Sequence, residues 1–325
     1  ATAVTLVPEM AKTAAHVTML QRSPTYVVAA PGEDKAANWL RTKLPAKLAY
    51  AITRWRKVLF GMFFYNYARK QPAKVKAGII DMVRKQLGPD YDVDKHFTPT
   101  YNPWDQRICL VPDADLFAAI KSGAAEVVTD HIETFTETGV QLKSGKVLEA
   151  DIVVSATGLE MLFLGGVDLR VDGIEVDPHE RLTYKGMMLE DVPNLAMAFG
   201  YTNASWTLKA DLIAGYVCRL LNHMRETGTV QCTARNEGAA VTAEPLLGLS
   251  AGYIQRAAGQ FPLQGAADPW RVHQSYLRDH RSMKRGPVDD GTMVFTGPSA
   301  APAAPVLGDH PDETHDETHT EDVLT

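Results

Sequence analysis

Residues near the start of the chain have the types and spacing needed to bind a phosphate group. Ala1, Thr2 and Ala3 open a helical segment and match the last three positions of a G-x-G-x-x-G/A turn, which binds pyrophosphate at a helix amino end. Arg22 lies 19 residues after Ala3, about where a dinucleotide-binding unit reads the ribose 2′ position. An arginine there, in place of an acid, would pair with the 2′-phosphate of NADP. The plainer interpretation is a surface arginine in a turn.

The elements that would position these residues follow from the apolar pattern. Residues 1–30 predict a helix, a β-rich strand in HVTMLQ and a turn that Pro24 closes. Pro8 is expected to kink or shorten the helix, because proline inside a helix removes a hydrogen bond. A unit of this kind would have a strand and glycines before its helix.

Residues 35–87 predict helices that mix aromatic with basic residues in KLAYAITRWRKVLFGMFFYNYARK. We expect these helices to pack on a neighbouring domain, with the Lys and Arg side chains extended outward. Weak association with a membrane surface is the alternative. Trp55, Phe60, Phe63 and Phe64 do not share one clean helix face, which weakens that alternative.

Short strands are expected after residue 100. The stretch YNPWDQRICLVPDADLF begins as a loop, with Pro103 and Pro112 on either side of a short apolar segment. After a short helix, segments around Ile132–Phe135 and Val140–Leu142 predict a hairpin, and an SGK turn leads to a third strand. Residues 151–158, DIVVSATG, predict a buried parallel strand. Three small residues end it and would let a backbone or a ligand approach closely: Ala156, Thr157 and Gly158.

The last third of the chain predicts one strand, one long helix and a tail. Residues 192–202 predict a strand leading to a loop, and residues 204–226 predict an amphipathic helix ended by Gly228. Residues 299–325 are Pro/Ala-rich and then acidic, and we expect them to be disordered. We expect no metal site at the three histidines of this tail: His310, His315 and His319.

Composition limits the class of protein. The 325 residues, 45% hydrophobic and 22% charged, suit about two globular domains. The formal charge is −6, but seven acids lie in the tail, and the rest has 33 basic and 32 acidic residues. This balance excludes the broad basic surface of a nucleic-acid-binding protein. Three cysteines without a CxxC pair, and no signal or membrane-spanning run, lead us to expect the cytoplasm.

Five motifs together resemble the flavin-containing Baeyer–Villiger monooxygenases: ATAVTLVP, HVTMLQRSPTY, YNPWDQRICLVPDADLF, DIVVSATG and YKGMML…VPNLAMAFGYTNASWTLKADL. The similarity runs from Ala1 to about Asp290 and is greatest to the actinobacterial branch that activates thioamide prodrugs. It implies an α/β fold of two nested dinucleotide-binding (Rossmann-like) domains for FAD and NADPH. It also implies that NADPH and O₂ form a C4a-peroxyflavin. This species converts ketones to esters or lactones and oxygenates sulfides or thioamides.

The resemblance implies roles for several residues. Arg107, in PWDQR, matches the family's active-site arginine, whose fixed cation can stabilise the peroxyflavin anion and the tetrahedral intermediate. Gln106 stands where some relatives have a lysine that touches the 2′-phosphate, so Arg22 with Ser23 is the expected reader of that phosphate.

Three further positions match the family. Ala156-Thr157-Gly158 matches the motif that links the NADPH domain back to the FAD domain. Trp206 and Lys209 match family-typical positions without an assigned role, and simple packing is the role that we expect of Trp206.

The resemblance also predicts domains. Residues 1–155 would be an NADPH-binding domain without its first strand, with a helical insertion at about 35–100. Residues 156–298 would be the C-terminal part of the FAD-binding domain. The chain contains no counterpart of the family's first FAD-binding GxGxxG, of its His and Trp-Pro fingerprint or of its catalytic Asp. We therefore expect an N-terminally truncated enzyme. An inactive fragment that does not bind FAD, and an amine- or sulfide-oxygenating flavin monooxygenase, are the alternatives; the oligomeric state stays open.

Overall fold

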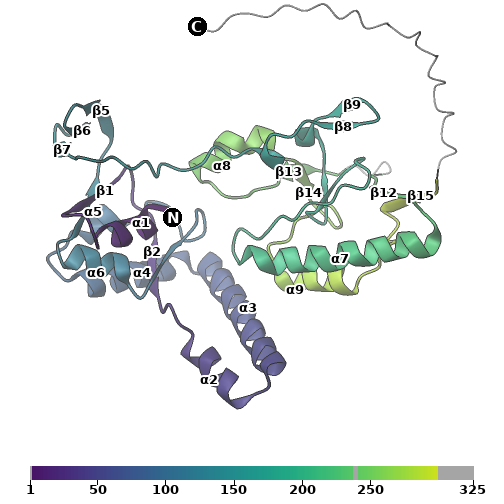
Figure 1. Ribbon diagram of the computed structural model, residues 1–325, viewed down its shortest axis with the longest axis horizontal. Coiled ribbons are helices and arrows are strands. Elements are labelled where there is room, and N and C mark those ends of the chain that lie inside the picture. Colours follow the sequence, from purple (N-terminus) through teal and green to yellow (C-terminus); the bar gives the residue numbers. More distant parts are fainter. Residues whose placement is uncertain (1, 237–240, 299–325) are drawn as a thin grey trace, which may run out of the picture.

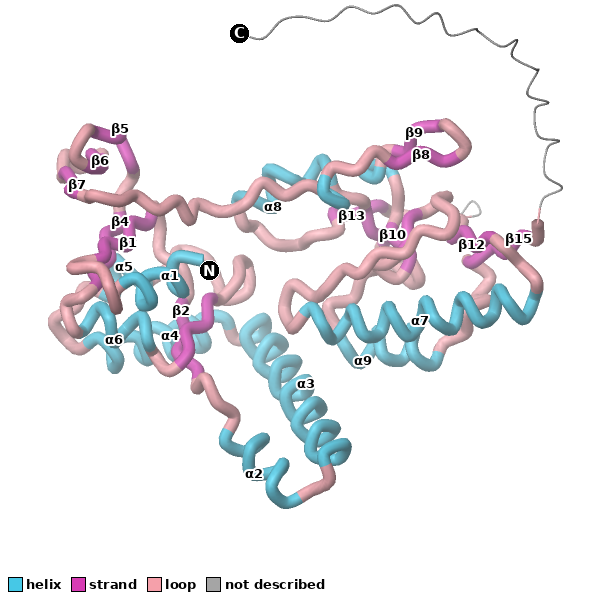
Figure 2. Tube along the Cα trace, in the orientation of Figure 1, coloured by secondary structure: helices cyan, strands magenta, loops and turns pink. Residues whose placement is uncertain are grey.

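The computed structural model describes residues 2–236 and 241–298, so the expected tail and its histidines lie outside the described residues. Figure 1 shows two parts, a first part that ends near residue 149 and a second that begins near residue 161. A segment without regular structure crosses between them, and a pair of helices, α2 and α3, projects away from both (Figures 1 and 2).

Two parallel strand pairs lie within the first part. Helix α1 (Thr2–Met10) leads to β1 (Val17–Gln21), which pairs with β4 (Ala125–Thr129); β2 (Val27–Ala30) pairs with β3 (Cys109–Pro112). Helix α6 (Asp115–Lys121) packs against α1, and apolar residues of both helices share one core with β1 and β3. Parallel strands connected through helices give the expected α/β architecture. Helix α1 continues through Pro8 and ends two residues later.

The helical prediction for residues 35–87 is confirmed. Helix α2 (Lys35–Lys43) begins at Asp34, whose side chain accepts a hydrogen bond of 3.0 Å from the backbone N–H of Ala37. The long helix α3 (Ala46–Lys70) follows. Helix α4 (Pro72–Leu87) has proline in its first turn, and Gly88 follows it with φ 93°. Helix α5 (Val93–Phe97) is short.

The hairpin prediction is also confirmed. Strands β5 (Ile132–Thr136), β6 (Gly139–Leu142) and β7 (Val147–Glu149) form a three-stranded antiparallel meander. Gly139 has no room for a side chain, because a Cβ there would collide with the backbone carbonyl of Leu148.

The second part is organised around one long helix, α7 (Trp206–Thr227), which ends at Gly228 with φ 69°, as predicted. Its apolar face packs in a core with buried tyrosine and methionine side chains of other segments. The remaining helices and strands are short: β8 (Leu169–Val171), β9 (Ile174–Val176), β10 (Thr183–Tyr184), β11 (Met188–Leu189), β12 (Gln231–Ala234), β13 (Ala243–Pro245), α8 (Gly252–Ala257), β14 (Leu263–Gly265), α9 (Tyr276–Asp279) and β15 (Met293–Thr296).

Two strand predictions are wrong. Residues 151–158 form no strand, and the side chain of Ile152 is 79% exposed, because no described strand lies beside this segment to complete a sheet. Residues 192–202 also lie outside any strand. There Pro193 lacks a backbone N–H, and Asn194 has φ 56°, so the chain cannot maintain a ladder of hydrogen bonds.

Among the described residues, no helix combines the length and the apolar character needed to cross a membrane.

Candidate functional site

The predicted phosphate-binding residues lie at one edge of the first parallel pair. The chain reverses between α1 and β1, so the amino end of α1, with Thr2 and Ala3, lies at the same edge as the carboxyl end of β1. Arg22 and Ser23 follow β1 directly and are exposed. No described residue forms an ion pair or hydrogen bond with Arg22, so its guanidinium is free to bind an anion. Ala1 lies outside the described residues.

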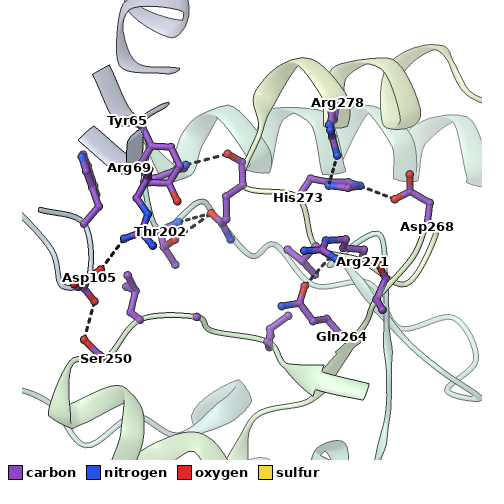
Figure 3. A pocket seen from close by; sticks show the side chains of 18 of the residues that line it. Tyr65, Arg69, Asp105, Thr202, Ser250, Gln264, Asp268, Arg271, His273 and Arg278 are labelled. Carbon is purple, nitrogen blue, oxygen red and sulfur yellow. Dashed lines mark hydrogen bonds and ion pairs between the residues drawn. The ribbon is translucent and has the colours of Figure 1, made fainter. Parts of the chain in front are cut away.

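A cavity of about 750 Å³ opens between the two parts of the molecule, and Figure 3 shows the side chains that surround it. Its volume falls within the range of small-molecule sites. The wall combines the end of α3, the loop before β3 and three segments of the second part. Charged and polar residues dominate this wall: Arg69, Asp105, Thr202, Gln264, Asp268, Arg271, His273, Gln274 and Arg278.

Asp105 fixes the loop that carries the PWDQR motif. Its carboxylate accepts hydrogen bonds from Arg69 Nη1 of α3 at 2.7 Å and from the backbone N–H of Asn102 at 3.1 Å. Its backbone carbonyl accepts two bonds of 3.0 Å from Ser250, one from the N–H and one from the hydroxyl. Helix α3, the motif loop and the segment around residue 250 therefore meet at one residue (Figure 3).

Arg107 lies beside this cavity. Its Nη2 donates a long hydrogen bond of 3.4 Å to the carbonyl of Thr202, which lines the wall. Thr202 is in turn fixed by Gln274, whose Oε1 accepts from its N–H at 2.9 Å and from its hydroxyl at 3.1 Å. Arg107 is exposed, and no carboxylate of the described residues pairs with it. A cation in this position can attract a ligand's negative charge.

The remaining predicted site residues do not line the cavity. Gln106 is next to Arg107, and its backbone bridges to Pro103. Thr2, Ala3, Arg22 and Ser23 lie at the α1–β1 edge, and the segment of Ala156, Thr157 and Gly158 is part of the link between the two parts. Gly158 has φ 113°, a conformation that favours glycine. The structure thus gives three separate locations to the predicted residues.

The sequence did not predict a cluster of three polar side chains in the cavity wall: Asp268, His273 and Arg278. His273 Nε2 lies 2.6 Å from Asp268 Oδ1, and Arg278 Nη1 lies 3.3 Å from His273 Nδ1. Because arginine can only donate, Nδ1 is the acceptor of that contact, and the Nε2–H donates to Asp268. Asp268 and His273 lie in an irregular stretch and Arg278 lies in the short helix α9, and no motif connects the three, so spacing alone could not reveal them.

Trp104 lines the cavity and carries a hydrogen-bond donor, its indole N–H. Its indole Nε1 is buried without a hydrogen-bond partner among the described residues, and its backbone has φ 70°. A buried donor without a partner is unfavourable unless a ligand or water occupies the space beside it.

A buried ion pair supports the wall from behind. Lys209, 1% exposed, has its Nζ 3.1 Å from Asp279 Oδ2, which also accepts a 2.6 Å hydrogen bond from the Tyr201 hydroxyl. Burial, and then the charge of Asp279, raise the pKa of Tyr201 far above its usual value. Tyr201 precedes Thr202, so this cluster holds the segment that Arg107 contacts. Lys209 therefore has a structural role.

Trp206 packs only in part, because it is 51% exposed. Its ring lies 5.4 Å from that of Phe199, measured between centroids, and it also covers Gly200, where a Cβ would collide with the indole. Glycine at this position allows the indole to lie directly on the backbone.

No family model matches the chain. It is 49% identical over 296 residues to "FAD-containing monooxygenase EthA" of Mycobacterium tuberculosis (strain ATCC 25618 / H37Rv), a match that covers 91% of this chain and 60% of that protein. It is 47% identical over 305 residues to the protein of that name in Mycolicibacterium smegmatis, which covers 94% of this chain and 62% of the relative. The chain thus spans about 60% of the length of these curated relatives.

Among solved structures, "Oxidized steroid monooxygenase bound to NADP" is similar with a TM-score of 0.59 at 15% sequence identity. The match covers 91% of this chain and 65% of that chain. This likeness confirms the predicted α/β dinucleotide-binding fold.

Proposed function

Because the chain is homologous to FAD-containing monooxygenases over nine tenths of its length, we propose that it contributes to an FAD- and NADPH-dependent monooxygenase of the Baeyer–Villiger type. The proposed reaction uses O₂ to convert ketones to esters or lactones, and it also oxygenates sulfides or thioamides. The described cysteines are free thiols, which supports a cytoplasmic location. The observation that carries the proposal is the Arg107 guanidinium, unpaired with any described carboxylate, beside the 750 Å³ cavity.

NADPH would bind through the α1–β1 edge. The exposed guanidinium of Arg22, with the hydroxyl of Ser23, suits the 2′-phosphate, because arginine can donate two parallel hydrogen bonds to phosphate. The amino end of α1 at the same edge, with Thr2 and Ala3, suits the pyrophosphate. The bound nucleotide supplies the reducing equivalents.

FAD, when bound, supplies the oxygen-activating chemistry. The chain contains no GxGxxG turn, so we assign none of its residues to the flavin pyrophosphate. Arg107 acts by stabilising the negative charge that develops on the reacting oxygen atoms. The indole N–H of Trp104 is a second donor, and Asp105 maintains the orientation of the loop that carries Trp104 and Arg107. The segment of Ala156 to Gly158 links the nucleotide-binding and flavin-binding regions in this proposal.

The first test is flavin retention. Purified protein is incubated with excess FAD and desalted, and its visible absorption spectrum is recorded. NADPH consumption is then followed with a ketone and with a sulfide, and the products are identified by mass spectrometry. Flavin retention with ester formation supports the proposal. A whole protein that retains flavin and forms sulfoxide, but no ester, would instead be a sulfide-oxygenating enzyme, and one that retains no flavin would contradict the proposal.

The second test isolates the nucleotide site. Arg22→Ala in the whole protein should raise KM for NADPH by an amount equivalent to about 2–3 kcal/mol, because a charge-assisted phosphate contact is lost. The NADH reaction is the matched control and should change little, since NADH has no 2′-phosphate. Equal losses with the two nucleotides would exclude Arg22 as the reader of the phosphate.

A further inference from the structure

The hairpin of α2 and α3 projects from the molecule. The carboxyl end of α3 packs on the first part, where Ala68 is buried with Tyr26 and Val75, and the middle of α3 packs on the second part. There Arg54 Nη2 donates to Asp211 of α7 at 2.8 Å, and the Trp55 ring lies 5.7 Å from that of Tyr276. Val58 reaches the core of the second part. The connection between the two helices, residues 44–45, lies at the outer end of the projection (Figures 1 and 2).

An apolar stripe is exposed along α3. Leu48, Ile52, Leu59 and Phe63 follow one another at intervals of four, seven and four residues, which places them on one helix face. Their exposed fractions lie between 40% and 66%. Of Trp55, Phe60, Phe63 and Phe64, only Phe63 lies on this stripe, so the aromatic residues alone do not reveal it.

The outer end also exposes aromatic and basic residues, of which Tyr50 lies on the side of α3 opposite Leu48 and Ile52. Trp39 of α2 is 60% exposed and Tyr50 of α3 is 63% exposed. Three cations beside them have no carboxylate partner among the described residues: Arg41, Lys43 and Lys47. We call these five residues, together with Leu48 and Ile52, the hairpin tip.

The charge of this region is opposite to that of the chain as a whole. Residues 35–70 contain nine Lys and Arg residues and no Asp or Glu, although the chain has a formal net charge of −6. A surface that combines unpaired cations, exposed Trp and Tyr and a Leu/Ile stripe matches the chemistry of an anionic lipid interface. A second copy docked tip to tip would bring like charges together without a compensating acid.

We propose that the hairpin tip binds the surface of an anionic lipid bilayer. Leu48 and Ile52 enter the boundary between head groups and acyl chains, Trp39 lies at the level of the head groups, and the three cations pair with lipid phosphates. The hairpin lies on the bilayer, and the rest of the molecule stays in the aqueous phase. This inference is independent of the proposed reaction.

Vesicle sedimentation tests the proposal. The protein should pellet with vesicles that contain phosphatidylglycerol, much less with phosphatidylcholine vesicles, and less at high salt because salt screens the cations. A triple variant, Arg41→Glu with Lys43→Glu and Lys47→Glu, should lose binding at least roughly tenfold. The matched control reverses three exposed lysines of the first part: Lys121→Glu, Lys143→Glu and Lys146→Glu.

A second variant separates insertion from charge attraction. Leu48→Ser with Ile52→Ser should weaken vesicle binding while leaving all cations in place, and circular dichroism checks that the helices are retained. Equal binding to charged and neutral vesicles, or equal losses in the tip and control triple variants, would overturn the proposal. Concentration-dependent dimers that the serine variant abolishes, without vesicle binding by the parent protein, would assign the face to a second copy instead.

Discussion

Helices α3 and α7 have nearly the same length, 25 and 22 residues, but they use their apolar faces differently. In α7, the buried residues Leu212, Ile213, Tyr216, Leu220 and Met224 recur at helical spacing and pack in the core. In α3 only Ala49, Val58 and Ala68 are buried, and an equally regular stripe faces solvent. Helical periodicity therefore shows that a helix has an apolar face but not what covers it.

The largest expected difference concerns two ion-paired lysines, one on each helix. Lys209→Ala should destabilise the protein by about 3–5 kcal/mol, because it leaves the buried Asp279 carboxylate without its cation. Lys57→Ala on α3 removes an exposed pair with Asp34 and should change stability little, because solvent screens exposed charges. Urea unfolding measures both changes. Similar losses would mean that α3 is as tightly integrated as α7.

A pair of leucine truncations tests the same contrast without charge. Leu212→Ala in α7 should cost about 2–5 kcal/mol, since it creates a cavity in the core. Leu59→Ala on the exposed stripe of α3 should change the free energy of unfolding by no more than about 0.5 kcal/mol. A large loss at Leu59 would show that another surface covers the stripe in solution.

Helix α3 lines the cavity through Tyr65 and Arg69, and the segment before α7 lines it through Thr202 and Asn203. Arg107→Ala removes the cation that contacts Thr202 and should lower kcat about 100-fold, with flavin reduction by NADPH retained. Arg69→Ala is the control, because it breaks only the pair with Asp105 and should lower kcat a few-fold. Stopped-flow reduction and product analysis in the whole protein separate the two steps. Retained oxygenation by the Arg107 variant would exclude its proposed role.

The smallest effect should come from pH at the contact between α3 and the helical turn His280–Arg285 that follows α9. Burial, and then the charges of Lys284, Arg285 and Arg54, lower the pKa of His280, whose ring lies 5.7 Å from that of Trp55. The unfolded chain therefore binds a proton more readily at this histidine, and stability should fall as the pH drops through the ordinary histidine pKa of about 6.5. His280→Gln should flatten this dependence in urea titrations at neutral and mildly acidic pH. An unchanged profile would contradict the assignment.

Local patterns were sufficient for the elements whose hydrogen bonds form within a short segment. Helices α2, α3, α4 and α7 and the hairpin of β5 and β6 were predictable, and Gly228 marked the end of α7. The strand expected at residues 151–158 was wrong for the opposite reason. A parallel strand exists only if other strands lie beside it, and an apolar run carries no information about those neighbours.

The candidate site divides in the same way into features that local sequence predicts and features that depend on distant contacts. The sequence by itself determined the family resemblance, and with it Arg107 and the spacing of Arg22 from the first helix. Only the tertiary structure decided that Arg107 contacts Thr202 beside the cavity and that Asp268, His273 and Arg278 form a cluster in its wall. It also decided that Lys209 is buried against Asp279 while the stripe of α3 is exposed. These features depend on contacts between residues far apart in the chain, which composition and periodicity do not encode.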